Sequence, residues 1–388
     1  MESSYLFILE IAIILAVAHL AGMLSSKLKQ PVVLGQIIAG IILGIGIMEK
    51  TELIEVFAQI GVILLMFIAG LETDVDELRR SVRSSSLIAT GGVILPAVLV
   101  FISIMLFFPG HDQSSAIFLG IVTTATSVSI SVQTLREIGK LKSRQGIMIL
   151  GAAIIDDVIG IVLLTLLIGI VRPGMSHSVE RVVFDLAALS AVIFIAGWLI
   201  LKGIRHFSDK ADIDEAVISF ALIICLMLAF VSEAFGVAAI TGAYFAGIIF
   251  SMTGYKHRVS HEMGRLSELV FTPIFFVSIG MDIDLIAALQ AVGVGSMLII
   301  FGSIGKVIGC GFGARVSGFN PEQSLQIGIG MIPRAEVAII VANLGLQMTI
   351  LSEADMAATV LMVLVTTLMT PMILKWSFNR EMLVNERI

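Results

Sequence analysis

The stretch GIMILGAAIIDDVIGIVLLTLLIGIV, residues 146–171, decides the fold of this chain. It is long enough to cross the hydrocarbon layer of a membrane as a helix, and Asp156 and Asp157 are its only charged residues. A carboxylate near the centre of a bilayer costs about 2.5 kcal/mol or more, and two neighbouring carboxylates also repel each other. The pair therefore predicts a membrane helix that handles a proton or a small cation.

The composition of the whole chain indicates an integral membrane protein. Of its 388 residues 57% are hydrophobic and only 14% are charged, with a mean hydropathy of +1.05. A soluble protein of this size needs more polar surface than that. Cys225 and Cys310 lie inside apolar runs, so they predict no disulfide framework. The N-terminus, MESSYLFILE, carries an acid where a secretory signal carries basic residues, and we expect a retained first span.

Segments of roughly 20 apolar residues cross a bilayer as helices. By this measure the sequence predicts an all-α polytopic fold with thirteen transmembrane helices, at residues 4–25, 31–48, 53–71, 86–108, 114–135, 146–171, 182–203, 214–235, 237–254, 266–281, 285–314, 322–349 and 354–376. With the N-terminus outside, nineteen of the 24 Lys and Arg residues lie in inner loops or in the tail. Only Lys306 and Arg334 lie inside spans. This segregation predicts a multi-pass protein of the cell inner (plasma) membrane with a cytoplasmic C-terminus.

The two halves of the chain resemble each other. GQIIAGII at residues 35–42 is echoed by GAYFAGII at 242–249, and GLETD at 70–74 by GMDID at 280–284. Each echo falls seven spans later, so the second copy is inserted in the opposite orientation. Either echo alone could be chance similarity between Gly-rich helices, but two in order predict an inverted-topology repeat of six spans, one linker span and six spans.

The repeat pairs the fifth span with the twelfth, and both contain unusual residues. The fifth holds TTATSVSIS at residues 123–131, and the twelfth holds GIGMIPRAE at 328–336. Proline and flanking glycines interrupt a helix, and two crossed broken helices offer carbonyls and helix ends to an ion. The hydroxyls of Thr126 and Ser127 could ligate that ion, although Ser and Thr also strengthen helix packing in lipid.

Lys306, in GSIGKVIG at residues 302–309, needs a carboxylate partner inside the membrane. The repeat brings its span to the Asp156 and Asp157 span. Neighbouring helix positions point about 100° apart, so one carboxylate pairs with Lys306 and the other is left for the transported ion. A permanent salt bridge is the alternative, and we expect that architectural role for Arg334 with Glu336, which would support the crossover.

Two other classes of protein fit these residues less well. An intramembrane aspartyl protease also buries two aspartates, but they must approach a peptide bond from different helices. A cation channel uses acidic rings or carbonyl filters and needs no competing protonation site. We therefore expect a secondary transporter rather than an enzyme, with no cofactor and no nucleic-acid partner.

These motifs, taken together, resemble the monovalent cation:proton antiporter-2 family, in particular its bacterial sodium/proton antiporters of the NapA and GerN type. The resemblance covers essentially the whole chain, and four intramembrane motifs occur in order. It implies that Asp157 binds the ion, that Asp156 is the partner of Lys306, and that Thr126 and Ser127 lie at the helix crossover. Asp157 and Thr126 would then ligate the transported sodium.

The resemblance also implies a homodimer. Residues 1–85 and 214–283 would form a dimerisation domain, residues 86–181 and 284–388 a mobile core that ends in a short cytoplasmic tail, and residues 182–213 a linker span. The aspartate pair resembles the electrogenic members. Kef-like potassium members carry a nucleotide-binding domain after the last span, whereas only about a dozen residues follow Trp376 here. We therefore expect exchange of sodium or lithium for protons, with potassium/proton antiport or Kef-like potassium efflux as the alternative.

Overall fold

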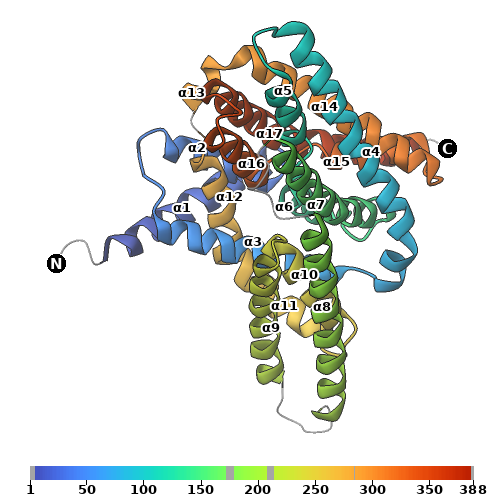
Figure 1. Cartoon of the computed structure of the whole chain (residues 1–388). Helices are drawn as coiled ribbons and strands as arrows, with labels where there is room; N and C mark the ends of the chain where they lie inside the picture. The colour runs from blue at the N-terminus through green and yellow to red at the C-terminus, as the bar shows by residue number, and fades with distance from the viewer. Residues whose placement is uncertain (1–4, 172–178, 208–213, 284, 386–388) are drawn as a thin grey trace.

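The computed structural model describes residues 5–171, 179–207, 214–283 and 285–385, and every regular element in this part of the chain is helical (Figure 1). Its helices are α1 (Leu6–Lys27), α2 (Val32–Gly44), α3 (Glu52–Glu72), α4 (Val75–Phe107), α5 (Gln113–Val122), α6 (Val128–Glu137), α7 (Arg144–Val171), α8 (Val179–Phe207), α9 (Asp214–Ala234), α10 (Ala239–Ser251), α11 (Lys256–Leu266), the π-helical turn η2 (Ser267–Phe271), α12 (Thr272–Met281), α13 (Leu285–Gln290), α14 (Val292–Val316), α15 (Pro321–Gly330), α16 (Glu336–Gln347) and α17 (Glu353–Asn385).

Long apolar helices dominate the structure. Within the described residues, nine helices are long and apolar enough to cross a membrane, and shorter apolar helices such as α2, α5 and α10 lie among them. Large apolar side chains remain exposed on the α8 and α9 pair, which projects from the rest of the molecule in Figure 1; Phe194 is 77% exposed and Phe230 is 74% exposed. Lipid is the medium that accommodates such a surface, so the chain is a multi-pass membrane protein.

The predicted spans coincide with helices, but three helical segments extend or divide them. α4 begins at Val75, eleven residues before the predicted span, because Asp74 accepts hydrogen bonds from the backbone N–H groups of Asp76 and Glu77 and caps the helix. The polar loop predicted before the tenth span is the helix α11, and the predicted eleventh span is divided near Ala291 into α13 and α14. Hydropathy finds only the apolar part of a helix, so polar extensions of this kind escape it.

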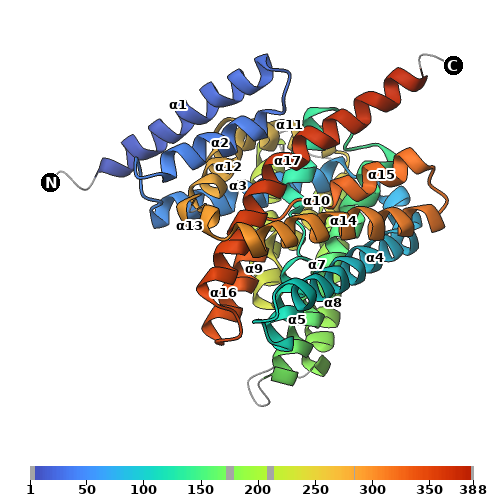
Figure 2. The same cartoon turned by 90° about the horizontal axis from the view of Figure 1, so that it is seen from above.

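Close helix contacts rely on glycine at matching places in the two halves. Gly40 of α2 packs against the backbone of α12 at Gly280, and Gly247 of α10 packs against the backbone of α3 at Gly70. A Cβ atom at any of these four positions would overlap the facing backbone. α4 and α14 also run side by side (Figure 2) and meet backbone to backbone.

The helices fall into two packed groups. α2 and α3 pack on α12 and α10, with α1 and α9 beside them, while α4 packs on α14, α7 and α5, and α17 packs on α14, α15 and α16. Contacts between the groups include those that α6 makes with α3 and α2, and those that α17 makes with α2. The candidate site lies inside the second group.

Two apolar segments are broken in the middle, as the sequence predicts. The backbone leaves the helix between α5 and α6 at residues 123–127, and between α15 and α16 at residues 331–335. Pro333 lies inside the second break. The breaks meet, because the backbone N–H of Ser127 donates to the carbonyl oxygen of Pro333 at 2.7 Å.

Candidate ion site at the helix crossover

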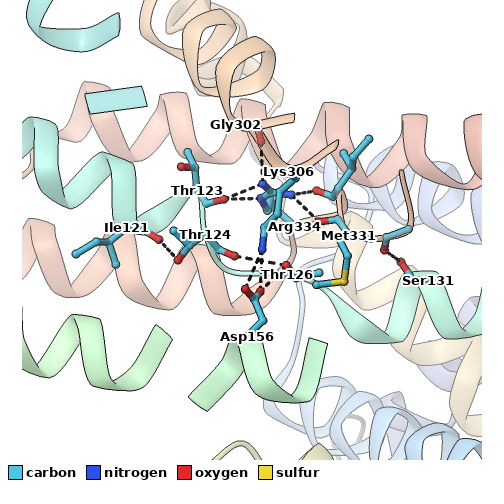
Figure 3. Close-up of polar contacts among 12 residues, drawn as sticks. Ile121, Thr123, Thr124, Thr126, Ser131, Asp156, Gly302, Lys306, Met331 and Arg334 are labelled. Carbon is cyan, nitrogen blue, oxygen red and sulfur yellow. Dashed lines mark hydrogen bonds and ion pairs between the residues drawn. The ribbon is translucent and has the colours of Figure 1, made fainter. Parts of the chain in front are cut away.

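A buried ion pair lies at the crossover of the two broken helices (Figure 3). The ammonium of Lys306, on α14, lies 3.0 Å and 2.9 Å from the two carboxylate oxygens of Asp156, on α7. The two side chains are 0% and 1% exposed, respectively. Burial at this level removes both charges from water, so each depends on the other for stabilisation.

Thr126 is the third member of this cluster. Its hydroxyl donates to Asp156 Oδ2 at 2.6 Å from the break between α5 and α6. Asp156 Oδ2 therefore accepts from both an ammonium and a hydroxyl. The sequence expectation that Asp156 and Lys306 are in contact is confirmed by these distances.

Small residues allow α14 to bring Lys306 to this depth. Gly305 packs directly against Pro96 of α4, and Gly309 packs against the backbone at Gly91. With no side chain between them the two helices approach closely, as in the small-residue interfaces of membrane helices. The long lysine side chain then reaches α7 past Gly92, where a Cβ atom would lie 3.6 Å from the ammonium.

Arg334 is the second buried cation at the crossover, and it binds backbone carbonyls (Figure 3). Its Nε and Nη2 atoms donate to the carbonyl oxygen of Thr123 at 3.0 and 2.7 Å, and its Nη1 donates to those of Met331 and Ile332. Thr123 and Met331 are the residues at which α5 and α15 end. The guanidinium thus donates hydrogen bonds to the free carbonyls of two half-helices, and its positive charge interacts favourably with the negative ends of their dipoles.

Hydroxyl groups complete the crossover. Ser131 donates to the carbonyl oxygen of Gly330 at 2.5 Å, and Thr367 of α17 donates to that of Arg334 at 2.5 Å. The hydroxyl of Ser127 lies 3.2 Å from that of Ser129. These contacts give carbonyls and hydroxyls that the breaks free from helical hydrogen bonding polar neighbours inside the protein, as a non-helical backbone at membrane depth requires.

The remaining predicted residues lie around this cluster. Asp157 follows Asp156 on α7 and is half-buried. Glu336 begins α16, but its side chain lies outside the described residues, so its expected pairing with Arg334 stays a prediction. The carbonyls bound by Arg334 were missed from the sequence, because a backbone acceptor has no residue signature.

A buried amide pair was also missed. Gln145 of α7 donates to Gln326 of α15 at 2.9 Å, and the two residues are 6% and 1% exposed. The only indication of this pair in the sequence was a glutamine near the start of the sixth predicted span and another near the start of the twelfth. Among the described residues, no three His, Cys, Asp or Glu side chains are gathered as a resident metal site would require.

A buried ion pair beside a helix crossover, inside a multi-pass helical protein, is typical of a secondary transporter. The chain belongs to the sodium/hydrogen exchanger family, whose transmembrane profile matches residues 14–380.

Two curated relatives from Bacillus cereus are similar over nearly their full length. The Na(+)/H(+)-K(+) antiporter GerN is 41% identical, with 97% of each chain covered. The protein named "Probable Na(+)/H(+) antiporter GerT" is 44% identical, with 96% of this chain and all of that protein covered.

A solved structure has the same fold. The sodium proton antiporter MjNhaP1 from Methanocaldococcus jannaschii, determined at pH 8, superposes with a TM-score of 0.71 over 95% of this chain and 96% of its own. The two sequences are only 18% identical, so this similarity concerns the fold alone.

Proposed function

We propose that this protein exchanges sodium for protons across the membrane by competition at a single carboxylate, Asp157. It is a secondary antiporter by family, and both relatives carry names that describe sodium/proton antiport. The observation that carries the site assignment is the ion pair of Lys306 with Asp156. We assign the exchange of a proton for a cation to Asp157, which follows Asp156 on α7 and is half-buried.

The crossover supplies the oxygens that a sodium ion needs once it has lost its water. Hard cations prefer carboxylate, hydroxyl and carbonyl ligands. Asp157, Thr126 and Ser127 are the candidate ligands for the transported sodium. Protonated Asp157 would not bind sodium, and sodium bound to Asp157 would prevent its protonation. The two substrates would therefore compete for one binding site.

Lys306 and Asp156 provide a second proton in this proposal. Sodium held near Asp156 weakens the attraction of that carboxylate for Lys306, and the ammonium can then release a proton. Thr126 is placed to take part, since its hydroxyl donates to Asp156 in the present arrangement. Two protons would then exchange for one sodium, and the cycle would move net charge.

We further propose thirteen spans arranged as an inverted repeat. The glycine contacts support this plan, because Gly40 meets Gly280 and Gly247 meets Gly70, so each copy lends one glycine to each contact. The broken pairs α5–α6 and α15–α16 also stand at matching places, in the fifth and twelfth spans. Orientation rests on the basic residues, which give an outer N-terminus and a cytoplasmic C-terminus in the cell membrane.

The two packed groups support a division into domains. The group around α2, α3, α10 and α12 would be the dimerisation domain of a homodimer, and the group around α4–α7 and α14–α17 the mobile core. α8 would link them. Alternating access would follow from movement of the core, with its crossover, against the fixed domain.

Potassium is the second candidate cation. The printed name of GerN includes potassium as well as sodium, and that relative is 41% identical to this chain. Exchange of potassium for protons would use the same carboxylate with wider ligand spacing.

Purified protein in liposomes tests the assignment. Asp157→Asn keeps the size of the side chain but cannot bind a proton or a charge-balanced sodium, so sodium-dependent proton movement is expected to vanish while the protein still folds. Asp282→Asn, at the exposed ion pair with Lys50, is the matched control and should retain exchange. Exchange at the unmodified rate in Asp157→Asn liposomes would exclude Asp157 as the site.

A further inference from the structure

An apolar groove of about 390 Å³ lies between α1 and α2, which run side by side at the edge of the molecule (Figure 2). Small residues form its floor, because Gly35 packs directly on the backbone of Ala21 and brings the two helices together. Leucine and isoleucine side chains line the rest of the groove, and Leu20, Leu24 and Ile42 are 62%, 60% and 53% exposed. The groove is therefore open to the medium around the protein.

The length of the groove matches one leaflet of a bilayer. Along α1 it extends from Val17 to Leu28, eleven residues further, which is about 16 Å at 1.5 Å per residue. The hydrocarbon layer is about 30 Å thick, so the groove accommodates the apolar part of a lipid from one side of the membrane only. Leu28 directly follows the last residue of α1, so the groove ends where α1 ends. The orientation proposed above places this end on the cytoplasmic side.

The cytoplasmic end of the groove is polar and positively charged. Lys27 and Lys29 flank Leu28 and are exposed, and Gln30 lines the groove itself. Lys29 has a φ of 57°, so the chain turns there in the left-handed region and leaves α1. Among the described residues, no ion pair joins either ammonium to a carboxylate. Both charges are therefore available to an anion at the end of the groove.

Two charged side chains from other helices reach the same turn, and each binds the backbone. Glu137 of α6 accepts hydrogen bonds from the N–H groups of Val32 at 2.6 Å and Val33 at 3.1 Å, and so caps α2. Lys375 of α17 donates to the carbonyl oxygen of Lys29 at 2.8 Å. One carboxylate thus stands against three ammonium groups, and the turn between α1 and α2 keeps a net positive charge.

We propose that the groove and its basic end form a binding site for an anionic phospholipid of the inner leaflet. One acyl chain lies between α1 and α2, and the phosphate lies at Lys27 and Lys29, with the amide of Gln30 as a further donor. An apolar groove alone holds any lipid, whereas exposed lysines at its end attract an anionic headgroup. The site is independent of the proposed exchange, and only its assignment to the inner leaflet rests on the proposed orientation.

Native mass spectrometry of the full-length protein in detergent tests the headgroup contact without any transport. The probes are dioleoyl phosphatidylglycerol, which is anionic, and dioleoyl phosphatidylcholine, which has the same acyl chains and no net charge. The unmodified protein should retain the anionic lipid more tightly. Lys27→Gln combined with Lys29→Gln should weaken retention of phosphatidylglycerol on the order of tenfold and leave that of phosphatidylcholine unchanged.

A second pair of lysines provides the matched control for charge. Lys140 and Lys142 have the same spacing and lie in the loop between α6 and α7. Lys140→Gln combined with Lys142→Gln removes the same charge from the protein and should retain phosphatidylglycerol like the unmodified protein.

Ile38→Trp tests the groove itself. Ile38 lines the groove and is 41% exposed, so an indole at this position obstructs the acyl chain without entering the packed interior. Retention of both lipids should fall. Ile94→Trp places the same side chain at an exposed position of α4 and should leave retention unchanged. Thermal melting shows that each variant is folded.

Three results would overturn the site. Equal retention of the two lipids by the unmodified protein, or unchanged retention after loss of Lys27 and Lys29, would exclude the headgroup contact. Glycerol phosphate has no acyl chain, and if it raised the melting temperature as much as phosphatidylglycerol, the ligand would be a free anion. If Ile38→Trp changed the proportion of dimer and left lipid retention intact, a second copy of the chain would occupy the groove.

Discussion

Lys306 and Arg334 are both cations buried inside the same helical group, and they are held in opposite ways. Lys306 is 0% exposed and contacts a carboxylate, whereas Arg334 is 1% exposed and, in its described contacts, binds backbone carbonyls. An ammonium is a compact charge whose pKa shifts readily on burial, but a guanidinium keeps its charge and presents several donors in a fixed plane. In the proposed transport cycle Lys306 would therefore be the cation that changes its charge, and Arg334 would be a fixed support.

The partners of the two cations agree with this division. The partner of Lys306 is another ionisable side chain, and the two form one buried pair. The carbonyls of Thr123 and Met331 cannot titrate, and they need a donor in every state of the cycle. Replacing each cation in turn therefore tests which one takes part in proton exchange and which one only stabilises the structure.

The largest effect is expected from Arg334. In Arg334→Met the carbonyls at the ends of α5 and α15 lose their donors, and each stranded buried acceptor costs about 1–3 kcal/mol. The protein is expected to fold poorly or to melt far below the unmodified protein in detergent.

Arg334→Lys sharpens the test of the support. A single ammonium cannot reach the carbonyls of both half-helices, so most of the loss in melting temperature should remain. A melting temperature equal to that of the unmodified protein would show that charge alone, rather than the planar fork, supports the crossover.

Lys306→Ala is expected to lower the stability substantially, although less than Arg334→Met. This change strands the Asp156 carboxylate, and removing one partner of a buried pair typically costs about 3–5 kcal/mol. Thermal melting measures the loss. Lys306→Met combined with Asp156→Asn leaves no buried charge and should recover part of it. Unchanged melting in the single variant would contradict the pairing.

Much of this comparison could be predicted from the sequence. Charges inside an apolar run are costly, so Asp156, Asp157 and Lys306 stood out at once, and proline with glycines marked the break at residues 331–335. The partners of Arg334 could not be predicted, because they are backbone groups exposed only by the breaks.

The contact of Glu137 was equally hidden from the sequence. Nothing in residues 133–137 indicates that this glutamate caps α2, since the contact joins segments about 100 residues apart. The polar start of α4 was missed because water-facing turns of a helix carry no apolar signal. The sequence thus identified the charged residues that are energetically unfavourable inside a membrane, but not the backbone groups to which such residues bind.

The smallest expected effect concerns voltage. If Lys306 releases a proton during the cycle, exchange moves net charge and responds to an imposed potential by about 2.3 kcal/mol per charge per 100 mV. Lys306→Arg keeps the positive charge but cannot release a proton, so any exchange that it retains should ignore voltage. The reversal point of sodium/proton exchange in voltage-clamped liposomes gives the comparison. Equal voltage dependence in both proteins would make Lys306 a fixed support like Arg334.

The central claim is that sodium and protons compete for Asp157, and the sodium concentration at half-maximal rate tests it most directly. This concentration is measured in proteoliposomes from pH 6 to pH 9, with the two sides held at known ion gradients. Competition predicts that it rises about tenfold for each unit of falling pH once the site is mainly protonated, while saturating sodium restores the same maximal rate. A half-maximal concentration that stays constant across this range, with a maximal rate that falls instead, would contradict a shared site.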